Sequence, residues 1–395
     1  MRLLTEETIS KYIQTVGKRN QIDEIIKPVF LIQRLLGQQT LDPSWTWRRY
    51  IWNQLFTVSL LLYVILGTFE VLSQITDIKT IAEAYYTLII CSICPIKYLL
   101  FVGQRYTFQK LYITAKTDLF DLIKQNSDEK ESAVLDKGKV MIKLLFALIT
   151  FPCIMYLVIA LCYYAGEERV TLSKTTSILM PMTSPFYEIG LILHTIFLFE
   201  MAFSILIIDM WFVFLMLMLC MASDSLSQML KVKQNNSETD QMYSIRLNDL
   251  LRRFHKAHQK QTKYLSILSD MYKWASLVPL LQVFLFVCLL LLLMSEGFNW
   301  AFASNILPIF VQIFAYNWYG EQIKIKTANL NMALLDFDWT KMQLKDKRSY
   351  YIIMTYMNKE FGIKTAVGND LSLFTMTSVL KASYQTYAVL NTMKE

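Results

Sequence analysis

The stretch Ile189-Gly-Leu-Ile-Leu-His-Thr-Ile-Phe-Leu-Phe-Glu-Met-Ala-Phe-Ser-Ile-Leu-Ile-Ile-Asp-Met-Trp-Phe-Val-Phe-Leu-Met-Leu-Met-Leu-Cys220 decides the fold class of this chain. Its 32 residues contain no Lys or Arg. An α-helix rises about 1.5 Å per residue, so this stretch would span about 48 Å as a helix. The hydrocarbon core of a bilayer is about 30 Å thick. The stretch therefore predicts a helix that crosses a membrane and continues beyond it.

Six more apolar stretches accompany it in a chain whose residues are 54% hydrophobic. Each holds roughly the 20 residues that a membrane-spanning helix needs. The sequence therefore predicts an all-α integral membrane protein with seven transmembrane helices. The predicted spans are Leu55–Leu72, Ile81–Val102, Leu144–Ala165, Ile189–Cys220, Ala275–Met294, Trp300–Tyr319 and Leu371–Met393.

Positive charge is distributed unevenly between the connections of these spans. Of the 39 Lys and Arg residues, 33 lie before the first span and in the second, fourth and sixth connections, whereas 4 lie in the other connections and after the last span. Because Lys and Arg are retained on the cytoplasmic side during insertion, we expect a cytoplasmic N-terminus and an extracellular C-terminus. This orientation is opposite to that of a G-protein-coupled receptor. The loop bias also accounts for the net charge of +7, so we expect no nucleic-acid partner.

Patterns for catalysis and metal binding are weak in this sequence. All six cysteines fall inside predicted spans, where they are typical of small apolar core residues rather than of disulfides. Cys91 and Cys94 have the C-x-x-C spacing, but a helix embedded in lipid offers no group that stabilises a thiolate. His255 and His258 lie on a basic helix with no third ligand nearby in the sequence. We therefore expect no enzyme activity, no metal and no cofactor.

Helical patterns continue beyond the membrane at several spans. The helical pattern of the fourth span continues, with more polar residues, past Cys220. After a connection at Gln234–Gln241 an amphipathic helix begins near Met242 and leads into the fifth span. The sixth span continues past Gly320, and Trp339–Phe361 contains a further short amphipathic helix. The apolar stripes of these segments need partners in water. The sequence thus predicts a cytosolic helical bundle that holds an oligomer together.

The last predicted span is unusually polar for a helix in lipid. One of its faces carries small and polar side chains, followed near the outer end by two apolar ones. A stripe of this kind is typical of a water-filled path with a hydrophobic gate. It also fits a helix buried in a bundle and hydrogen-bonded to its neighbours, and the residues alone leave both interpretations open. The face consists of Ser378, Ala382, Gln385, Val389 and Met393, at steps of 4, 3, 4 and 4 residues.

Four segments of the chain carry a resemblance to a known family. They are Met180–Glu188, Trp318–Glu321, Ala333–Trp339 and Ser378–Leu390. Together with the number and orientation of the predicted spans, these segments resemble the insect odorant receptors.

The resemblance implies a subunit that binds a small volatile odorant and, with the shared co-receptor of the family, opens a non-selective cation channel. It implies a heterotetramer assembled by the cytosolic helices in the plasma membrane of an olfactory sensory neuron dendrite, in contact with lipid and permeating cations. The connection Ser223–Lys273 is shorter than the corresponding loop of the co-receptor. In this respect the chain looks like a ligand-tuning subunit of the family. In this family the polar face of the last span lines the pore, and Val389 and Met393 match its outer gate.

Two alternatives remain beside this family. A gustatory receptor of the same superfamily is the nearest, because Thr386-Tyr387 begins the closing motif of that family, although Met393 stands where the motif has Gln. A transporter is more distant, because seven unmatched spans do not form inverted repeats.

The resemblance also implies an odorant pocket in the outer half of the second, third, fourth and sixth spans. Such a pocket needs aromatic and aliphatic side chains with few polar groups. His194 can bond either to an odorant or to a neighbouring helix, and each aromatic residue can serve packing instead. The expected ligand-binding residues are Tyr85, Tyr86, Ile89, Met155, Tyr156, Ile159, Tyr163, Leu191, His194, Thr195, Phe197, Asn305 and Ile306.

These expectations divide the chain into six parts. Residues 1–54 form a cytoplasmic and interfacial segment, residues 55–220 hold spans 1–4 with the pocket, and residues 221–273 are cytosolic anchor helices. Residues 274–320 hold spans 5 and 6, residues 321–370 are further anchor helices, and residues 371–395 form the pore-lining span with a short outer tail.

Overall fold

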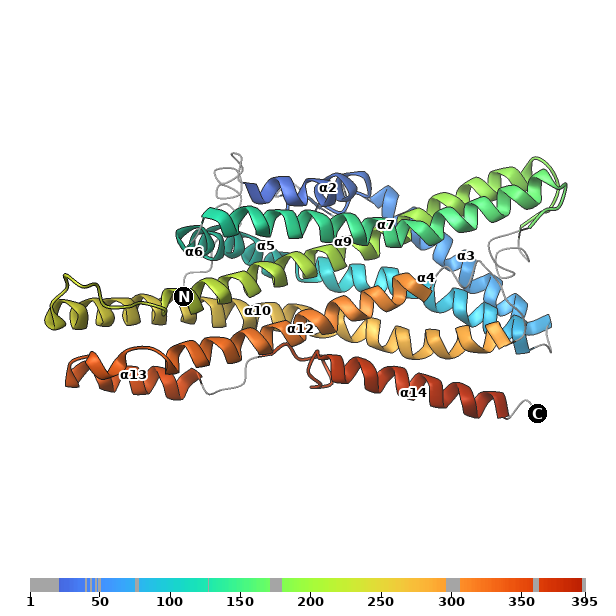
Figure 1. Ribbon diagram of the computed structural model, residues 1–395. Coiled ribbons are helices and arrows are strands. Elements are labelled where there is room, and N and C mark those ends of the chain that lie inside the picture. Colours follow the sequence, from blue (N-terminus) through green and yellow to red (C-terminus); the bar gives the residue numbers. More distant parts are fainter. Residues whose placement is uncertain are drawn as a thin grey trace.

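The computed structural model describes residues 21–39, 41–42, 45–46, 48, 51–74, 78–126, 128–170, 180–295, 306–357 and 362–392. Figure 1 shows its long helices running side by side, and the predicted all-α class is confirmed. Apart from the helices, the described residues contain an isolated antiparallel β-bridge between Lys364 and Asp370. In chain order the elements are α2 (Gln21–Leu35), α3 (Ile51–Gln74), α4 (Ile78–Gly103), α5 (Arg105–Thr114), the π-helical turn η1 (Ala115–Leu119), α6 (Phe120–Asn126), α7 (Asp128–Ala165), α9 (Phe186–Met229), α10 (Asp240–Ser295), α12 (Ile306–Leu335), the 3-10 turn η2 (Trp339–Lys341), α13 (Leu344–Met357) and α14 (Leu373–Thr392).

Apolar composition explains the longest of these helices. Within the described residues, four helices are long and apolar enough to cross a membrane: Ile81–Gly103, Gly138–Ala165, Phe186–Met229 and Asp240–Ser295. They contain the second to fifth predicted spans. The other three predicted spans fall on α3, α12 and α14, whose described residues do not reach that length of apolar sequence, so the count of seven stays a prediction.

Helix α9 forms the centre of the bundle. It packs against α3, α4, α7, α10 and α12, and most of its residues between Leu206 and Leu219 are buried. Trp211 of α9 lies edge-on against Phe108 and Tyr112, with 4.7 Å and 5.7 Å between the ring centroids. The apolar stretch that indicated a membrane helix is thus enclosed largely by protein rather than by lipid.

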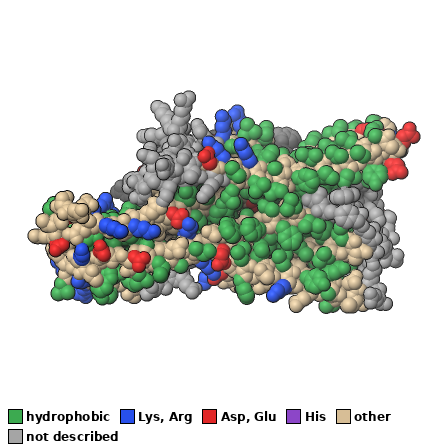
Figure 2. Space-filling model, in the orientation of Figure 1, with side chains coloured by type: hydrophobic (Ala, Val, Ile, Leu, Met, Phe, Trp, Pro, Cys, Tyr) green, Lys and Arg blue, Asp and Glu red, His purple; other side chains and the backbone are tan. Residues whose placement is uncertain are grey.

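The connections between the helices sort to the two ends of the bundle. In Figure 1 the α9–α10 connection, α13 and the short helices α5 and α6 lie toward one end of the bundle. These elements belong to the connections that are rich in Lys and Arg in the sequence. The C-terminal ends of α3, α7 and α14 lie toward the other end. On the face in Figure 2, hydrophobic side chains cover the middle, and Lys, Arg, Asp and Glu gather mainly toward the α13 end. This arrangement agrees with the charge pattern, while the direction of insertion stays a prediction.

Three helices continue well beyond the apolar spans, as the sequence predicts. Helix α9 runs unbroken to Met229, α10 begins at Asp240, and α12 runs to Leu335. Helix α13 is the short amphipathic helix expected before the last span. The bundle therefore has a region of paired helices outside the predicted membrane.

A buried ion pair joins three helices in the middle of the bundle. Lys97 Nζ of α4 lies 2.7 Å from Asp209 Oδ1 of α9, and the two side chains are 0% and 4% exposed. From α12, the Tyr316 hydroxyl donates a hydrogen bond to Asp209 Oδ1 at 2.7 Å, and the Gln312 amide donates one to Asp209 Oδ2. An ionised carboxylate loses its hydrogen bonds to water on burial, and these donors compensate for that loss.

The start of α14 is fixed against α12. The backbone N–H of Ser372 donates a hydrogen bond to Asn317 Oδ1 at 3.2 Å. Gly320 allows the close approach, because a Cβ atom at this position would lie 2.2 Å from the Leu371 carbonyl oxygen. The backbone at the head of α14 therefore lies directly on α12.

Replacing Lys97 by Met should destabilise the bundle, because Asp209 then remains buried without its cation. We expect a loss of about 3 kcal/mol, within the range for breaking a buried pair. Thermal melting of the detergent-solubilised protein measures the loss as a lower melting temperature. A second change, Asp209→Asn, should recover most of it, because Asn still accepts the hydrogen bond from Tyr316. Equal melting of the wild type and Lys97→Met would contradict this account.

Replacing Gly320 by Ala should also lower the melting temperature. The added methyl group has to push Leu371 away, and overpacking of this kind costs roughly 1–3 kcal/mol. The control is Gly103→Ala at the end of α4, where an added Cβ meets no atom within 4 Å. If the two variants melt alike, the close packing at Gly320 is not important for stability.

Candidate functional site

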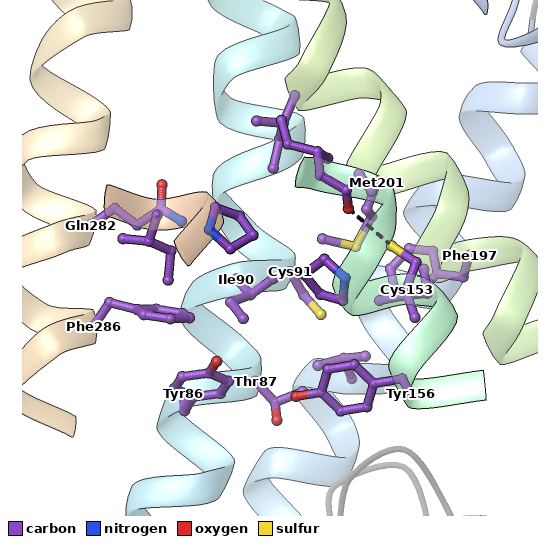
Figure 3. A pocket seen from close by; sticks show the side chains of 18 of the residues that line it. Tyr86, Thr87, Ile90, Cys91, Cys153, Tyr156, Phe197, Met201, Gln282 and Phe286 are labelled. Atoms are coloured by element: carbon purple, nitrogen blue, oxygen red, sulfur yellow. Dashed lines mark hydrogen bonds between the residues drawn. The ribbon is translucent and has the colours of Figure 1, made fainter. Parts of the chain in front are cut away.

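Residues of six helices line a cavity of about 190 Å³ within the bundle. Figure 3 shows α4, α7, α9 and α10 contributing side chains to it from different directions, with Gln282 and Phe286 on one side and Cys153 and Phe197 on the other. The lining residues are Tyr63 and Val64 of α3; Tyr86, Thr87, Ile90 and Cys91 of α4; Ile149, Pro152, Cys153 and Tyr156 of α7; His194, Phe197, Leu198, Met201, Ala202 and Ile205 of α9; Gln282 and Phe286 of α10; and Pro308, Ile309 and Gln312 of α12.

The wall of the cavity is mainly apolar and aromatic. The Tyr86 and Phe286 rings pack together with 4.2 Å between their centroids, and Tyr63 packs on His194 at 5.5 Å. The Thr87 hydroxyl is turned to its own helix, where it donates to the Glu83 carbonyl at 3.0 Å. Such a wall suits a small, mostly apolar molecule with few polar groups.

Four of the expected ligand-binding residues line this cavity together: Tyr86, Tyr156, His194 and Phe197. They come from α4, α7 and α9, three of the four helices that were expected to share one site. The fourth, α12, also lines the cavity, but through Pro308, Ile309 and Gln312 rather than through the expected residues. His194 faces the cavity beside Tyr63, a place that suits a ligand contact, although the ring contact also serves packing.

The other expected residues lie elsewhere. Leu191 packs one turn away from the cavity with Ala160 and Met180, and the Thr195 hydroxyl donates to the Leu191 carbonyl at 2.7 Å. Ile306 packs on the main core, and Asn305 lies outside the described residues. The remaining five are exposed or half-buried without lining the cavity: Tyr85, Ile89, Met155, Ile159 and Tyr163.

Sequence reasoning missed two helices and the inner end of the cavity. Helices α3 and α10 contribute Tyr63 and Gln282, and the inner wall includes Met201 and Gln312. On α4, α7, α9 and α12, most of the missed residues lie one or two helical turns along the chain from the expected ones. A signal was present at Gln282, a carboxamide in an otherwise apolar span, because polar groups in lipid are costly and usually have a role.

The face predicted on the last span points away from the rest of the chain. Ser378 and Gln385 are exposed, Val389 is 58% exposed, and Ala382 is half-buried. On the opposite side, Ser383 is fully buried where α14 packs against α10 and α12. The remaining member of the face, Met393, lies outside the described residues. The described polar stripe thus lies on the outer surface of this subunit.

Comparisons with known proteins agree on one family. A family model described as "7tm Odorant receptor" matches residues 77–384. Odorant receptor 10 of Aedes albopictus is 26% identical over 139 residues, which are 34% of this chain and 36% of that relative. The matched part therefore spans about a third of that relative's length.

Solved structures show the same fold. The insect olfactory receptor OR5 from Machilis hrabei matches with a TM-score of 0.73 at 15% identity, covering 96% of this chain and 99% of that chain. The same receptor in complex with eugenol matches with a TM-score of 0.75 at 15% identity, covering 97% and 100% of the two chains. Because the family model covers more than half of the sequence, the chain belongs to the odorant receptor family.

Proposed function

We propose that this chain binds a small volatile odorant in the cavity and, with co-receptor subunits, opens a non-selective cation channel in the dendrite membrane of an olfactory sensory neuron. The observation that carries the proposal is the apolar cavity lined by six helices in a chain of the odorant receptor family. The family and the fold are those of multi-pass membrane receptors rather than of enzymes.

The size and chemistry of the cavity support odorant binding. A closed apolar cavity of about 150 Å³ is large enough for benzene. The cavity here, at about 190 Å³, has room for one ring with short substituents. The structure of the similar receptor from Machilis hrabei with eugenol supports the idea that this fold accepts aromatic volatiles.

The exposed face of α14 supports a role in an oligomeric pore. The Ser378 hydroxyl donates to the Phe374 carbonyl of its own helix at 3.0 Å. The carboxamide of Gln385 is exposed, and turned toward lipid it would lose its hydration in hydrocarbon, which is unfavourable. In a ring of subunits the same face turns to a central axis, where water and cations satisfy it. The apolar Val389 then narrows the path near the outer end.

The helices beyond the predicted membrane support assembly with other subunits. Met332 and Leu335 at the end of α12 are 59% and 47% exposed, and Leu344 and Ile352 of α13 are 86% and 64% exposed. Large apolar side chains grouped in water are typical of an interaction surface. We therefore assign these ends to contacts with the co-receptor.

A continuous set of contacts supports coupling between the cavity and the pore helix. Gln312 lines the cavity and donates to Asp209, which also accepts from Tyr316 one turn further along α12. The next residue, Asn317, accepts from the backbone of Ser372 at the head of α14. An odorant that favours one arrangement of α12 would thereby shift the position of α14.

The first test co-expresses this chain with the co-receptor in oocytes and records current against an odorant panel that includes eugenol. We expect no current from the chain alone and odorant-evoked current from the pair. Cys153→Phe should lower odorant potency at least about tenfold, because the larger side chain occupies a site that binding has to fill. Cys162→Phe, on the exposed side of the same helix, is the matched control.

Two results would contradict the proposal. Odorant-evoked current from this chain alone would overturn the need for a co-receptor. Unchanged potency in Cys153→Phe, with normal surface expression, would show that odorants bind outside the cavity.

The second test probes the exposed face of α14 with cysteine substitutions and a charged thiol reagent applied during odorant-evoked current. Gln385→Cys and Val389→Cys should be modified and lose most of the current, because their side chains face the permeation path. Ser383→Cys should be unaffected, because that side chain is buried. Block at Ser383 without block at the other two positions would reverse the assignment of the pore face.

A further inference from the structure

The carboxamide of Gln282 on α10 has no assigned role in the fold. Gln282 is 7% exposed and lines the cavity one turn from Phe286, as Figure 3 shows. Its Oε1 atom is buried and has no hydrogen-bond partner among the described residues. An acceptor in this position is unusual, because buried polar groups are nearly always hydrogen-bonded.

A second glutamine at the cavity provides a comparison. Gln312 also lines the cavity, but its amide is bonded to Asp209, which accepts two further hydrogen bonds in the ion-pair network. Gln312 is therefore held by the fold, whereas Gln282 is held by packing alone. Of these two carboxamides, Gln282 is the one available to a ligand.

An unpaired carbonyl oxygen in an apolar wall discriminates between ligands. A ligand with an O–H group satisfies the oxygen, whereas a ligand without one leaves it buried and unpaired, at the cost of its lost hydration. Sites with a dedicated hydrogen-bonding group reject analogues that lack the matching group far more strongly than apolar sites reject a missing methylene. The terminal amide torsion is broad, so either amide atom can turn to the cavity.

We propose that Gln282 selects for a hydroxyl group, so that the preferred odorants are alcohols and phenols of about one ring. In Figure 3 the amide nitrogen of Gln282 points toward the cavity and the oxygen points away from it. A half-turn about the terminal amide torsion brings Oε1 to the cavity. The ligand O–H then donates to Oε1, and the ring packs beside the paired Phe286 and Tyr86 side chains. The size limit follows from the cavity volume of about 190 Å³. This inference rests on the proposed function, because it assumes that odorants enter this cavity.

The experiment compares pairs of ligands that differ by one methyl group on oxygen. The pairs are 4-methylphenol with 4-methylanisole, and cyclohexylmethanol with its methyl ether. They are applied to the full-length chain co-expressed with the co-receptor, and potency is read from concentration–response curves. For the wild type we expect the hydroxyl compound of a pair to be about tenfold more potent than its ether, the order expected for one buried hydrogen bond.

Gln282→Met removes the hydrogen bond while keeping the length of the side chain. We expect the potency ratio within each pair to fall to about threefold or less, with the ether response retained. Gln282→Leu repeats the test in a second variant, and surface labelling measures expression of each. Gln259→Met, at an exposed position on the same helix outside the predicted span, is the control and should keep the wild-type ratio.

Each possible outcome bears on the inference. It is overturned if the wild type responds equally to both members of each pair, or only to ligands without a hydroxyl group. It is also overturned if both Gln282 variants keep the wild-type ratio, or lose all responses at normal surface levels. If Cys153→Phe lowers odorant potency in the same assay, any of these four results leaves the proposed function intact. When Cys153→Phe changes nothing, the proposed function fails together with the inference.

Discussion

The ion pair between Lys97 and Asp209 is the interaction on which the rest of the bundle depends. It connects α4, α9 and α12 at a depth where water cannot replace any of its hydrogen bonds. A buried ion pair contributes little net stability compared with apolar packing, but it tolerates only one arrangement of its partners. The same three helices form much of the cavity wall. The pair therefore fixes the axial positions of these helices relative to one another, and the apolar residues around it pack between them.

The coarse fold could be predicted from the sequence because apolar length is a one-dimensional property. The runs around Ile81, Leu144, Ile189 and Ala275 are long enough to identify helices without knowledge of their neighbours. The unbroken continuation of α9 and α10 beyond the predicted spans could also be predicted, since a stripe of apolar residues indicates a helix in water as well. The last span was harder, because α14 owes its place to α10 and α12 rather than to its own hydrophobicity.

The cavity could be predicted only in part, because its depth depends on how the helices are stacked. Tyr86, Tyr156, His194 and Phe197 were expected because the resemblance implies a pocket in the outer half of their spans, and each supplies an aromatic ring there. The contributions of α3 and α10 depend on the register between helices, which periodicity within one helix does not contain. Lys97 and Asp209 illustrate the same limit: each appears in the sequence as an isolated charge, and their pairing across 112 positions becomes visible only in three dimensions.

Helix α9 has a mechanical consequence that follows from its length. It is one continuous rod of 44 residues, roughly 66 Å long at 1.5 Å per residue. Its first half borders the cavity, and its far end reaches the helices that lie outside the predicted membrane. If such a helix tilts as a rigid body, a small displacement beside the cavity corresponds to a larger sideways displacement at its distant end. The length of a single helix sets the ratio between the two displacements.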